Sequence, residues 1–285
     1  MSPLRVLLDV DAGIDDALAL LYAAATSRLD VVGVSAVVGN VPVDVGARNA
    51  ATVLAAVGKA SVPVAVGAAV TTEGRGARNG PTNHDPDGLG GVSVGPASPL
   101  PEPGRDVLAL FDRLTSDRPI TVAACAPLTN VADIAWRKLV ERIVVVGGEL
   151  VVEDEPEFNV GHDPTAAAAV LETDVPIAVY PVDLFESVVV PASLVSRLEE
   201  ATAASAQLAG KLLRVRRGHM LGDAGALVFL THPELFRVAR SRMAVVDQRL
   251  IPVGHSRSGS VVEVVTSADA AAVVETFIDA VESPF

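Results

Sequence analysis

Short runs of apolar, β-branched residues alternate along this chain with longer stretches of helical spacing, and this alternation limits the possible folds most strongly. Residues 31–38 form a continuous valine-rich run, which is typical of a parallel strand buried on both faces. Strands are predicted at residues 4–9, 31–38, 62–66, 120–124, 142–146 and 177–179. Helices are predicted at residues 15–25, 45–57, 107–114, 131–136 and 164–172. This order predicts an α/β fold with an open, mostly parallel sheet and helices on both faces.

Two longer stretches depart from this rhythm. Residues 71–103 are rich in Gly, Pro and Asn, and we expect a functional loop there because long loops in compact domains commonly carry binding residues. Residues 195–232 are expected to be mostly helical, so the Rossmann-like sheet would have additional helices towards its C-terminus. No stretch has the composition of a linker, and we predict a single domain over residues 1–285. Trp136 has core-like helical spacing and is predicted to pack in the interior.

Polar and small residues gather where the predicted strands end. Asp9 and Asp11 mark the end of the first strand, Gly39 and Asn40 follow the second, and Cys125 follows the fourth. Ligands of open parallel sheets bind outside the carboxyl ends of the strands. We therefore expect the functional site at this edge of the sheet.

The run DVDAGIDD brings Asp9, Asp11, Asp15 and Asp16 close together in the chain. Carboxylates this close repel one another unless a cation or hydrogen-bond donors hold them. Their oxygens are hard ligands that suit Ca²⁺ or Mg²⁺, and a strand end followed by a helix start can aim Asp11 and Asp16 at one point. A solvated turn with a helix cap would explain Asp15 and Asp16 but not the other two aspartates.

One enzyme class with a similar start is the magnesium-dependent phosphatase of the haloacid dehalogenase type. That class also carries D-x-D after its first strand, but it continues with a Gly-Thr-Leu-like turn. Here the turn reads Ala12, Gly13 and Ile14, and no later Lys and Asp-Asp pair completes the phosphatase site. The phosphatase stays open as an alternative, to be weighed against the motifs in the rest of the chain.

The aspartate run is the first of several motifs that follow one another along the chain. They are DVDAGIDDALAL at residues 9–20, VGN at 38–40, HDPDGLG at 84–90, PLTNVA at 127–132, GG at 147–148, EFN at 157–159, DP at 163–164 with AA at 166–167, and DA at 223–224. This series resembles the motifs of the calcium-dependent, inosine-uridine preferring nucleoside hydrolase family, with Ala12 in place of the usual proline. The resemblance covers roughly residues 4–235. It implies an enzyme that hydrolyses the N-glycosidic bond of ribonucleosides to ribose and free base.

The resemblance also implies a Ca²⁺ site. Its ligands would be the side chains of Asp11, Asp16 and Asp223 and the main-chain carbonyl of Cys125. Asp11 would in addition be the general base that activates a calcium-bound water. A non-catalytic calcium- and ribose-binding member of the same fold is a further alternative.

The sugar site implied by the resemblance lies beside the metal. Asp15, Asn40, Glu157 and Asn159 would hold the ribose hydroxyls, and Phe158 would lie near the sugar. Bond cleavage builds positive charge on the ribosyl group, which a pocket lined with carboxylates stabilises.

Two departures from the family pattern concern the leaving base and the ribose. Many members carry a His directly before the late calcium aspartate, where this chain has Gly222. Protonation of the base would then come from His84, from His219, from ordered water or from nothing, and we take His84 as the catalytic candidate. Residues 149–156 form a short acidic loop that lacks the Gly-Asn by which many members make another ribose contact.

The bulk composition limits partners and location. The 285-residue chain has a formal net charge of −13, which disfavours nucleic acid or an anionic membrane as partner because either needs a positive face. A neutral nucleoside fits better as the small-molecule partner. Cys125 is the single cysteine, and neither a signal peptide nor a transmembrane span is recognised, so we expect a cytoplasmic protein. The resemblance implies a homodimer or homotetramer.

Overall fold

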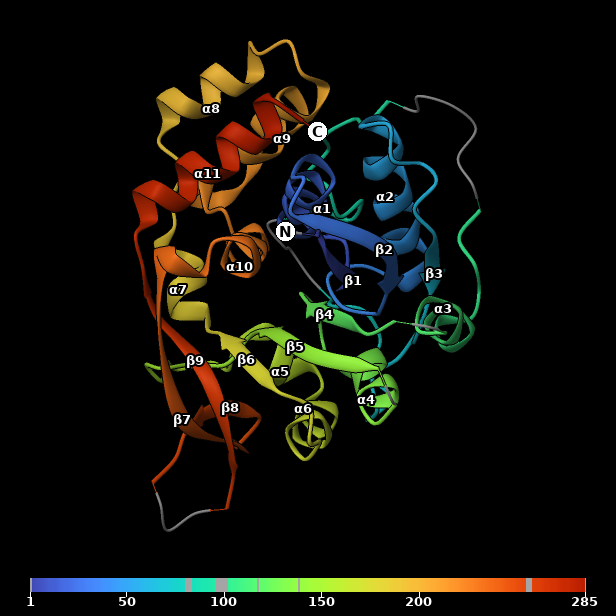
Figure 1. The fold of residues 1–285 in the computed structure, drawn as a ribbon, viewed down its shortest axis with the longest axis vertical. Coiled ribbons are helices and arrows are strands. Elements are labelled where there is room, and N and C mark those ends of the chain that lie inside the picture. The colour runs from blue at the N-terminus through green and yellow to red at the C-terminus, as the bar shows by residue number, and fades with distance from the viewer. Residues whose placement is uncertain are drawn as a thin grey trace.

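The sheet follows the predicted alternation of strands and helices (Figure 1). The computed structural model describes residues 2–79, 84–95, 102–116, 118–137, 139–254 and 258–284. One nine-stranded sheet runs through this described part, in the order β3-β2-β1-β4-β5-β6-β9-β7-β8. Its strands are β1 (Leu4–Val10), β2 (Leu29–Ala36), β3 (Val64–Val66), β4 (Ile120–Ala124), β5 (Val140–Val146), β6 (Ile177–Tyr180), β7 (Phe236–Val246), β8 (Arg249–Pro252) and β9 (Ser260–Ala268). In this spatial order, neighbouring strands are parallel from β3 as far as β9. Strand β7 is antiparallel to both β9 and β8. The predicted mostly parallel α/β fold is confirmed.

Helices cover both faces of the sheet. On β1, Val6 and Leu8 belong to one buried apolar cluster and Leu7 to another, because successive side chains of a strand point to opposite faces. The first cluster contains residues of α1 (Ile14–Ala25), α2 (Val43–Ala56), α7 (Val182–Ser187), α8 (Ala192–Glu199), α9 (Ala204–Val215), α10 (Asp223–Thr231) and α11 (Ala270–Glu282). The second contains residues of α3 (Val107–Leu114), α4 (Thr129–Ile134), α5 (Phe158–His162) and α6 (Pro164–Leu171). Two short 3-10 helices, η1 (Arg217–His219) and η2 (Pro233–Leu235), flank α10.

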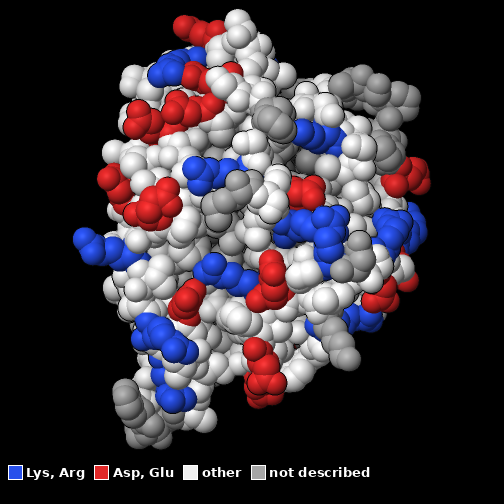
Figure 2. All heavy atoms as spheres, viewed as in Figure 1, with Lys and Arg blue, Asp and Glu red and all other residues white. Residues whose placement is uncertain are grey.

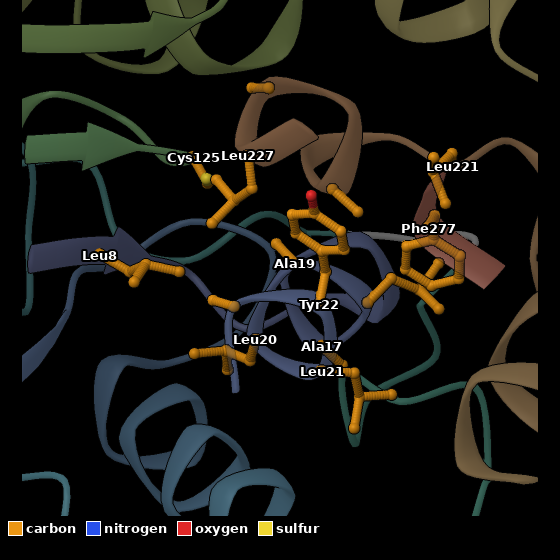
Figure 3. Close-up of a cluster of buried hydrophobic side chains, with 14 of the residues drawn as sticks. Leu8, Ala17, Ala19, Leu20, Leu21, Tyr22, Cys125, Leu221, Leu227 and Phe277 are labelled. Atoms are coloured by element: carbon orange, nitrogen blue, oxygen red, sulfur yellow. The ribbon is translucent and has the colours of Figure 1, made fainter. Parts of the chain in front are cut away.

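Helix α1 is enclosed on all sides, which fixes the start of this helix at the edge of the sheet. Every one of its residues is buried, since α1 packs against α2, α9, α10 and α11 as well as β2. Figure 3 shows Tyr22 of α1 beside Phe277 of α11, and their ring centroids are 6.1 Å apart. The same view shows Cys125, just after β4, next to Leu227 of α10.

Some expectations from the sequence need correction. Trp136 is 61% exposed, because α4 ends at Ile134 and the following turn directs the indole outwards, so the predicted packing role is wrong. Strands β7 to β9 and helix α11 were not predicted. Within the expected functional loop, residues 71–79 and 84–95 contain neither helix nor strand. Residues 80–83 and 96–101 of this loop lie outside the described residues. Among the described helices, none has the length and apolar character needed to cross a membrane.

Candidate active site

Carboxylates from three parts of the chain meet beyond the carboxyl ends of the central strands, where parallel sheets bind ligands. Asp11 directly follows β1, Asp15 and Asp16 lie in the first turn of α1, and Asp223 begins α10. All four are at most 7% exposed. One carboxylate oxygen each from Asp15, Asp16 and Asp223 lies within 4.8 Å of the others. The N-termini of α1 and α10 meet here, and their partial positive charges stabilise the carboxylates.

Asp11 is held by the segment that follows β2. Its Oδ2 accepts a hydrogen bond from the main-chain N–H of Asn40 at 2.7 Å, and its Oδ1 accepts one from the Asn40 side-chain amide at 3.1 Å. A Cβ atom on Gly39 would lie 1.9 Å from Asp11 Oδ2, so only glycine permits this approach. The VGN motif therefore serves to bring Asn40 against Asp11.

Burial and mutual repulsion disfavour the ionised form of the carboxylates in this cluster. Burial raises the pKa of Asp16 well above its usual value, and the charges of Asp11 and Asp223 raise it further. Burial likewise raises the pKa of Asp223, and it raises that of Asp9, behind the cluster, to about 7. Asp16 Oδ2 accepts the Gly13 amide at 2.8 Å, but its buried Oδ1 has no hydrogen-bond partner among the described residues. A cation is the simplest counterpart for such oxygens.

The structure differs in detail from the predicted metal ligand set. Asp16 and Asp223 come together as expected, whereas Asp11 is not part of this close group and is hydrogen-bonded to Asn40. The third carboxylate that shares the close group, however, belongs to Asp15. The main-chain carbonyl of Cys125 accepts a long hydrogen bond, 3.3 Å, from the side-chain amide of Asn159.

The ring of His84 contacts the first turn of α1. Its Nδ1 accepts the main-chain N–H of Ile14, the first residue of α1, at 3.0 Å. A neutral imidazole with Nδ1 as acceptor carries its hydrogen on Nε2. The same Nδ1 lies 3.7 Å from Asp15 Oδ1, too far for a hydrogen bond. His84 is therefore oriented so that only Nε2 can donate.

The EFN motif begins a short helix. Glu157 caps α5 by accepting the N–H groups of Asn159 and Val160, and it also accepts that of Gly148 at 2.9 Å. Burial raises the pKa of Glu157 in spite of these three donors. The Asn159 side-chain amide donates to the carbonyl of Val146 at 3.0 Å. The ring of Phe158 lies under the guanidinium of Arg78, 5.0 Å from the ring centroid.

These groups surround a cavity of about 620 Å³. Of the predicted site residues, those that line it are Asp15, Asp16, Asn40, His84, Cys125, Glu157, Phe158, Asn159 and Asp223. Asp11 is not among the described lining residues, but it is hydrogen-bonded to Asn40, which is. The size suits a ligand with a sugar and a base, and the wall combines carboxylates with two phenylalanine rings, Phe158 and Phe185.

A sequence profile of the family described as "Inosine-uridine preferring nucleoside hydrolase" matches residues 6–275. The chain belongs to this family. The resemblance predicted from the motifs and the enzyme class that it implies, a nucleoside hydrolase, are both confirmed.

Relatives align with this nucleoside hydrolase over most of its length. The non-specific ribonucleoside hydrolase RihC of Escherichia coli strain SMS-3-5 is 31% identical over 261 residues, which cover 86% of this chain and 84% of that protein. Among solved structures, a plant nucleoside hydrolase has a TM-score of 0.85 at 22% identity, covering 99% of this chain and 100% of that one. A purine-preferring ribonucleoside hydrolase from Gardnerella vaginalis has a TM-score of 0.86 at 19% identity and covers 98% of both chains. These structural similarities establish the fold.

One buried ion pair of this nucleoside hydrolase was not predicted from the sequence. Arg216 is 5% exposed and donates to Asp15 Oδ2 at 2.9 Å, and its guanidinium lies 5.5 Å from the ring centroid of Phe185. Burial alone would raise the pKa of Asp15, but the charge of Arg216 brings it below its usual value. No local pattern identifies Arg216, since the partner of this arginine lies on a distant helix.

The same neighbours, Asp15 and Phe185, explain why this chain has glycine and not histidine at position 222. This residue has φ of +65°, and a Cβ atom on it would lie 2.7 Å from Asp15 Cβ and 3.1 Å from Phe185 Cζ. There is no room for a His side chain at this position while Asp15 stays paired with Arg216. His219 is outside the described residues that line the cavity, whereas His84 is among them.

Proposed function

We propose that this nucleoside hydrolase cleaves the N-glycosidic bond of ribonucleosides to give ribose and the free base. The observation that carries the proposal is the convergence of the Asp15, Asp16 and Asp223 carboxylates in a cavity of about 620 Å³. A transition state with positive charge on the ribosyl group gains most from such a wall. The name of the RihC relative, a non-specific ribonucleoside hydrolase, supports the same substrate class.

Ca²⁺ is the cation that we propose for the cluster. The available donors are hard oxygens only, and the buried Oδ1 of Asp16 lacks a hydrogen-bond partner among the described residues, so the residues fit such an ion. Asp11, Asp16, Asp223 and the Cys125 carbonyl would hold it, with Asp15 close enough to join them. When bound, Ca²⁺ offsets the negative charge of the cluster and supplies coordination sites for further oxygen atoms.

Asp11 is proposed as the general base. Burial raises the pKa of its carboxyl group, which makes the ionised form a better proton acceptor than an exposed aspartate. Both oxygens accept hydrogen bonds from Asn40, but each carboxylate oxygen has a second lone pair. A water molecule between Asp11 and Asp16 would transfer its proton to Asp11 as its oxygen attacks the anomeric carbon.

The remaining cavity residues are proposed to position the nucleoside. Asp15, Asn40, Glu157 and Asn159 would hold the ribose hydroxyls, so that the anomeric carbon faces the attacking water. Phe158 would pack against the sugar.

His84 would act on the base instead of the sugar. Its Nε2–H would point towards the departing base, because Nδ1 already accepts the Ile14 amide. The leaving base would then be stabilised as the glycosidic bond breaks.

An assay of purine and pyrimidine ribonucleosides for free ribose, with and without chelator, tests the function. We expect ribose release that chelator abolishes and that added Ca²⁺ restores. Nucleoside binding without ribose release would instead indicate the non-catalytic alternative. Hydrolysis of phosphate monoesters would indicate the phosphatase alternative, which family membership does not support.

Location and assembly are proposed on less direct grounds. We propose a cytoplasmic protein, since its single cysteine, Cys125, is buried and unpaired. A homodimer or homotetramer stays a prediction from the family resemblance. On the face in Figure 2, basic side chains are scattered among acidic ones, which supports a neutral small molecule as partner over nucleic acid.

A further inference from the structure

The acidic loop at residues 149–156 forms one wall of the cavity and leads into Glu157. Its first residue, Glu149, is only 2% exposed. Glu149 Oε1 accepts the main-chain N–H of Glu157 at 2.6 Å, which links the first residue of the loop to the residue that follows it. Glu149 Oε2 accepts a hydrogen bond from Arg249 Nη1, also at 2.6 Å. A buried carboxylate with a single positive partner depends strongly on that partner.

Arg249 contacts this loop from β8, an edge strand of the sheet. It is the first residue of β8, and its side chain is 11% exposed. Besides Glu149, the guanidinium donates to the carbonyls of Asp154 at 2.8 Å and Glu155 at 3.1 Å. One planar side chain therefore binds both the beginning and the end of the loop.

The main chain of β8 adds a further contact. The N–H of Glu149 donates to the carbonyl of Leu250 at 2.9 Å, so the loop runs along the edge strand of the sheet. Arg249 itself is not among the described residues that line the cavity. Any effect of Arg249 on the reaction must therefore pass through the loop.

We propose that Arg249 is a positioning residue, which fixes Glu149 and the loop so that Glu157 presents its carboxylate to the ribose. The proposal rests on the proposed ribose-binding role of Glu157. The bonds form an unbroken series from Arg249 to the Glu149 carboxylate, to the Glu157 N–H and so to the start of α5. Lysine cannot replace this function fully, because an ammonium group lacks the planar fork that reaches three acceptors at once.

The test compares Arg249→Lys and Arg249→Ala with a matched control, Arg242→Ala. Arg242 lies on β7 of the same hairpin and donates to the carbonyl of Gly259 at 2.6 Å, away from the acidic loop. We expect Arg249→Ala to raise KM for ribonucleosides about tenfold or more, because a small displacement of a binding group is costly. Arg249→Lys should fall between, and Arg242→Ala should leave KM unchanged. The relative preference among bases should be the same in all variants.

Two further measurements separate positioning from general stability. Arg249→Ala should add little to the loss in kcat/KM caused by Glu157→Gln, because both changes act on one contact. Hydrogen exchange of the amides of Glu157, Asn159 and Val160 should be faster in Arg249→Ala and unchanged in Arg242→Ala. If Arg249→Ala does not fold, Arg249→Lys and Glu149→Gln take its place in both measurements.

The outcomes distinguish this inference from the proposed function. An active wild-type protein whose Arg249 variants keep their KM, or whose losses add fully to that of Glu157→Gln, overturns the positioning role alone. A wild-type protein that neither hydrolyses nor binds ribonucleosides overturns the proposed function and the positioning role with it. Raised KM, faster exchange and a less than additive double variant support the inference.

Discussion

Substitution of Gly222 tests the geometry of the cavity most directly. In Gly222→Ala, the new Cβ atom would lie 2.7 Å from Asp15 Cβ and about as close to the Phe185 ring, at 3.1 and 3.2 Å. Asp15 cannot retreat easily, because it is bound to Arg216 and lies in the buried first turn of α1. The backbone adds a second cost, since φ is +65° at this position.

The two costs can be estimated separately. A non-glycine residue in the left-handed region costs about 1–2 kcal/mol. Forcing an extra methyl group into a packed interior costs about 1–3 kcal/mol. Gly222→Ala should therefore lower the free energy of unfolding by about 2–5 kcal/mol, which corresponds to a drop in Tm of roughly 3–8 °C. Activity should fall as well, because Asp15 is displaced.

Gly58→Ala is the matched control for the backbone cost. Gly58 has φ of +78°, but a Cβ atom there would meet nothing within 4 Å. Its expected cost is the conformational part alone, about 1–2 kcal/mol. Thermal unfolding of both variants gives the difference. If Gly222→Ala is destabilised no more than Gly58→Ala, the steric argument is wrong and a His side chain at position 222 becomes feasible.

Four further predictions concern the cluster and the substrate. Asp16→Ala should abolish ribose release and also remove the stabilisation against thermal unfolding by Ca²⁺, which for the wild type at a hundredfold excess over Kd is about 2.7 kcal/mol. 2′-Deoxyribonucleosides should be poorer substrates by about 1–3 kcal/mol in kcat/KM, and equal values would remove the ribose assignment of Asp15. Arg216→Met should cost about 3–5 kcal/mol in urea unfolding, because it leaves the Asp15 carboxylate buried without its partner. His84→Ala should lower kcat on natural nucleosides by about 10²–10⁴-fold and hardly affect p-nitrophenyl riboside, whereas equal losses would mean that His84 only shapes the cavity.

Strands β1 to β6 were predictable because they are buried over most of their length. Runs such as residues 31–38 contain no charged residue, and a short run of this kind, rich in valine, is typical of a strand inside a parallel sheet. The antiparallel strands were missed for the opposite reason. Strand β7 carries Arg237, Arg240 and Arg242 and is exposed over much of its length, so its sequence has no continuous apolar run.

The site was predictable where its residues are close in sequence and belong to family motifs. Asp15, Asp16 and Glu157 were identified in this way and line the cavity. Arg216 and Arg249 were not identified, because each acts on a segment far away in the chain. Their partners are set by the packing of α9 and of the β7–β8 hairpin, which no local pattern of charges reveals.

The meeting of α1 and α10 also determines when the site forms during synthesis. Asp15 and Asp16 leave the ribosome early, whereas Arg216 and Asp223 follow roughly 200 residues later, which takes on the order of 10–40 s at usual elongation rates. Until then α1 can pack against α2 but lacks α10 and α11, and its carboxylates lack their buried arginine. The nascent chain therefore has to keep the first turn of α1 in water while the sheet grows, and the acidic centre closes only as the last third of the protein arrives.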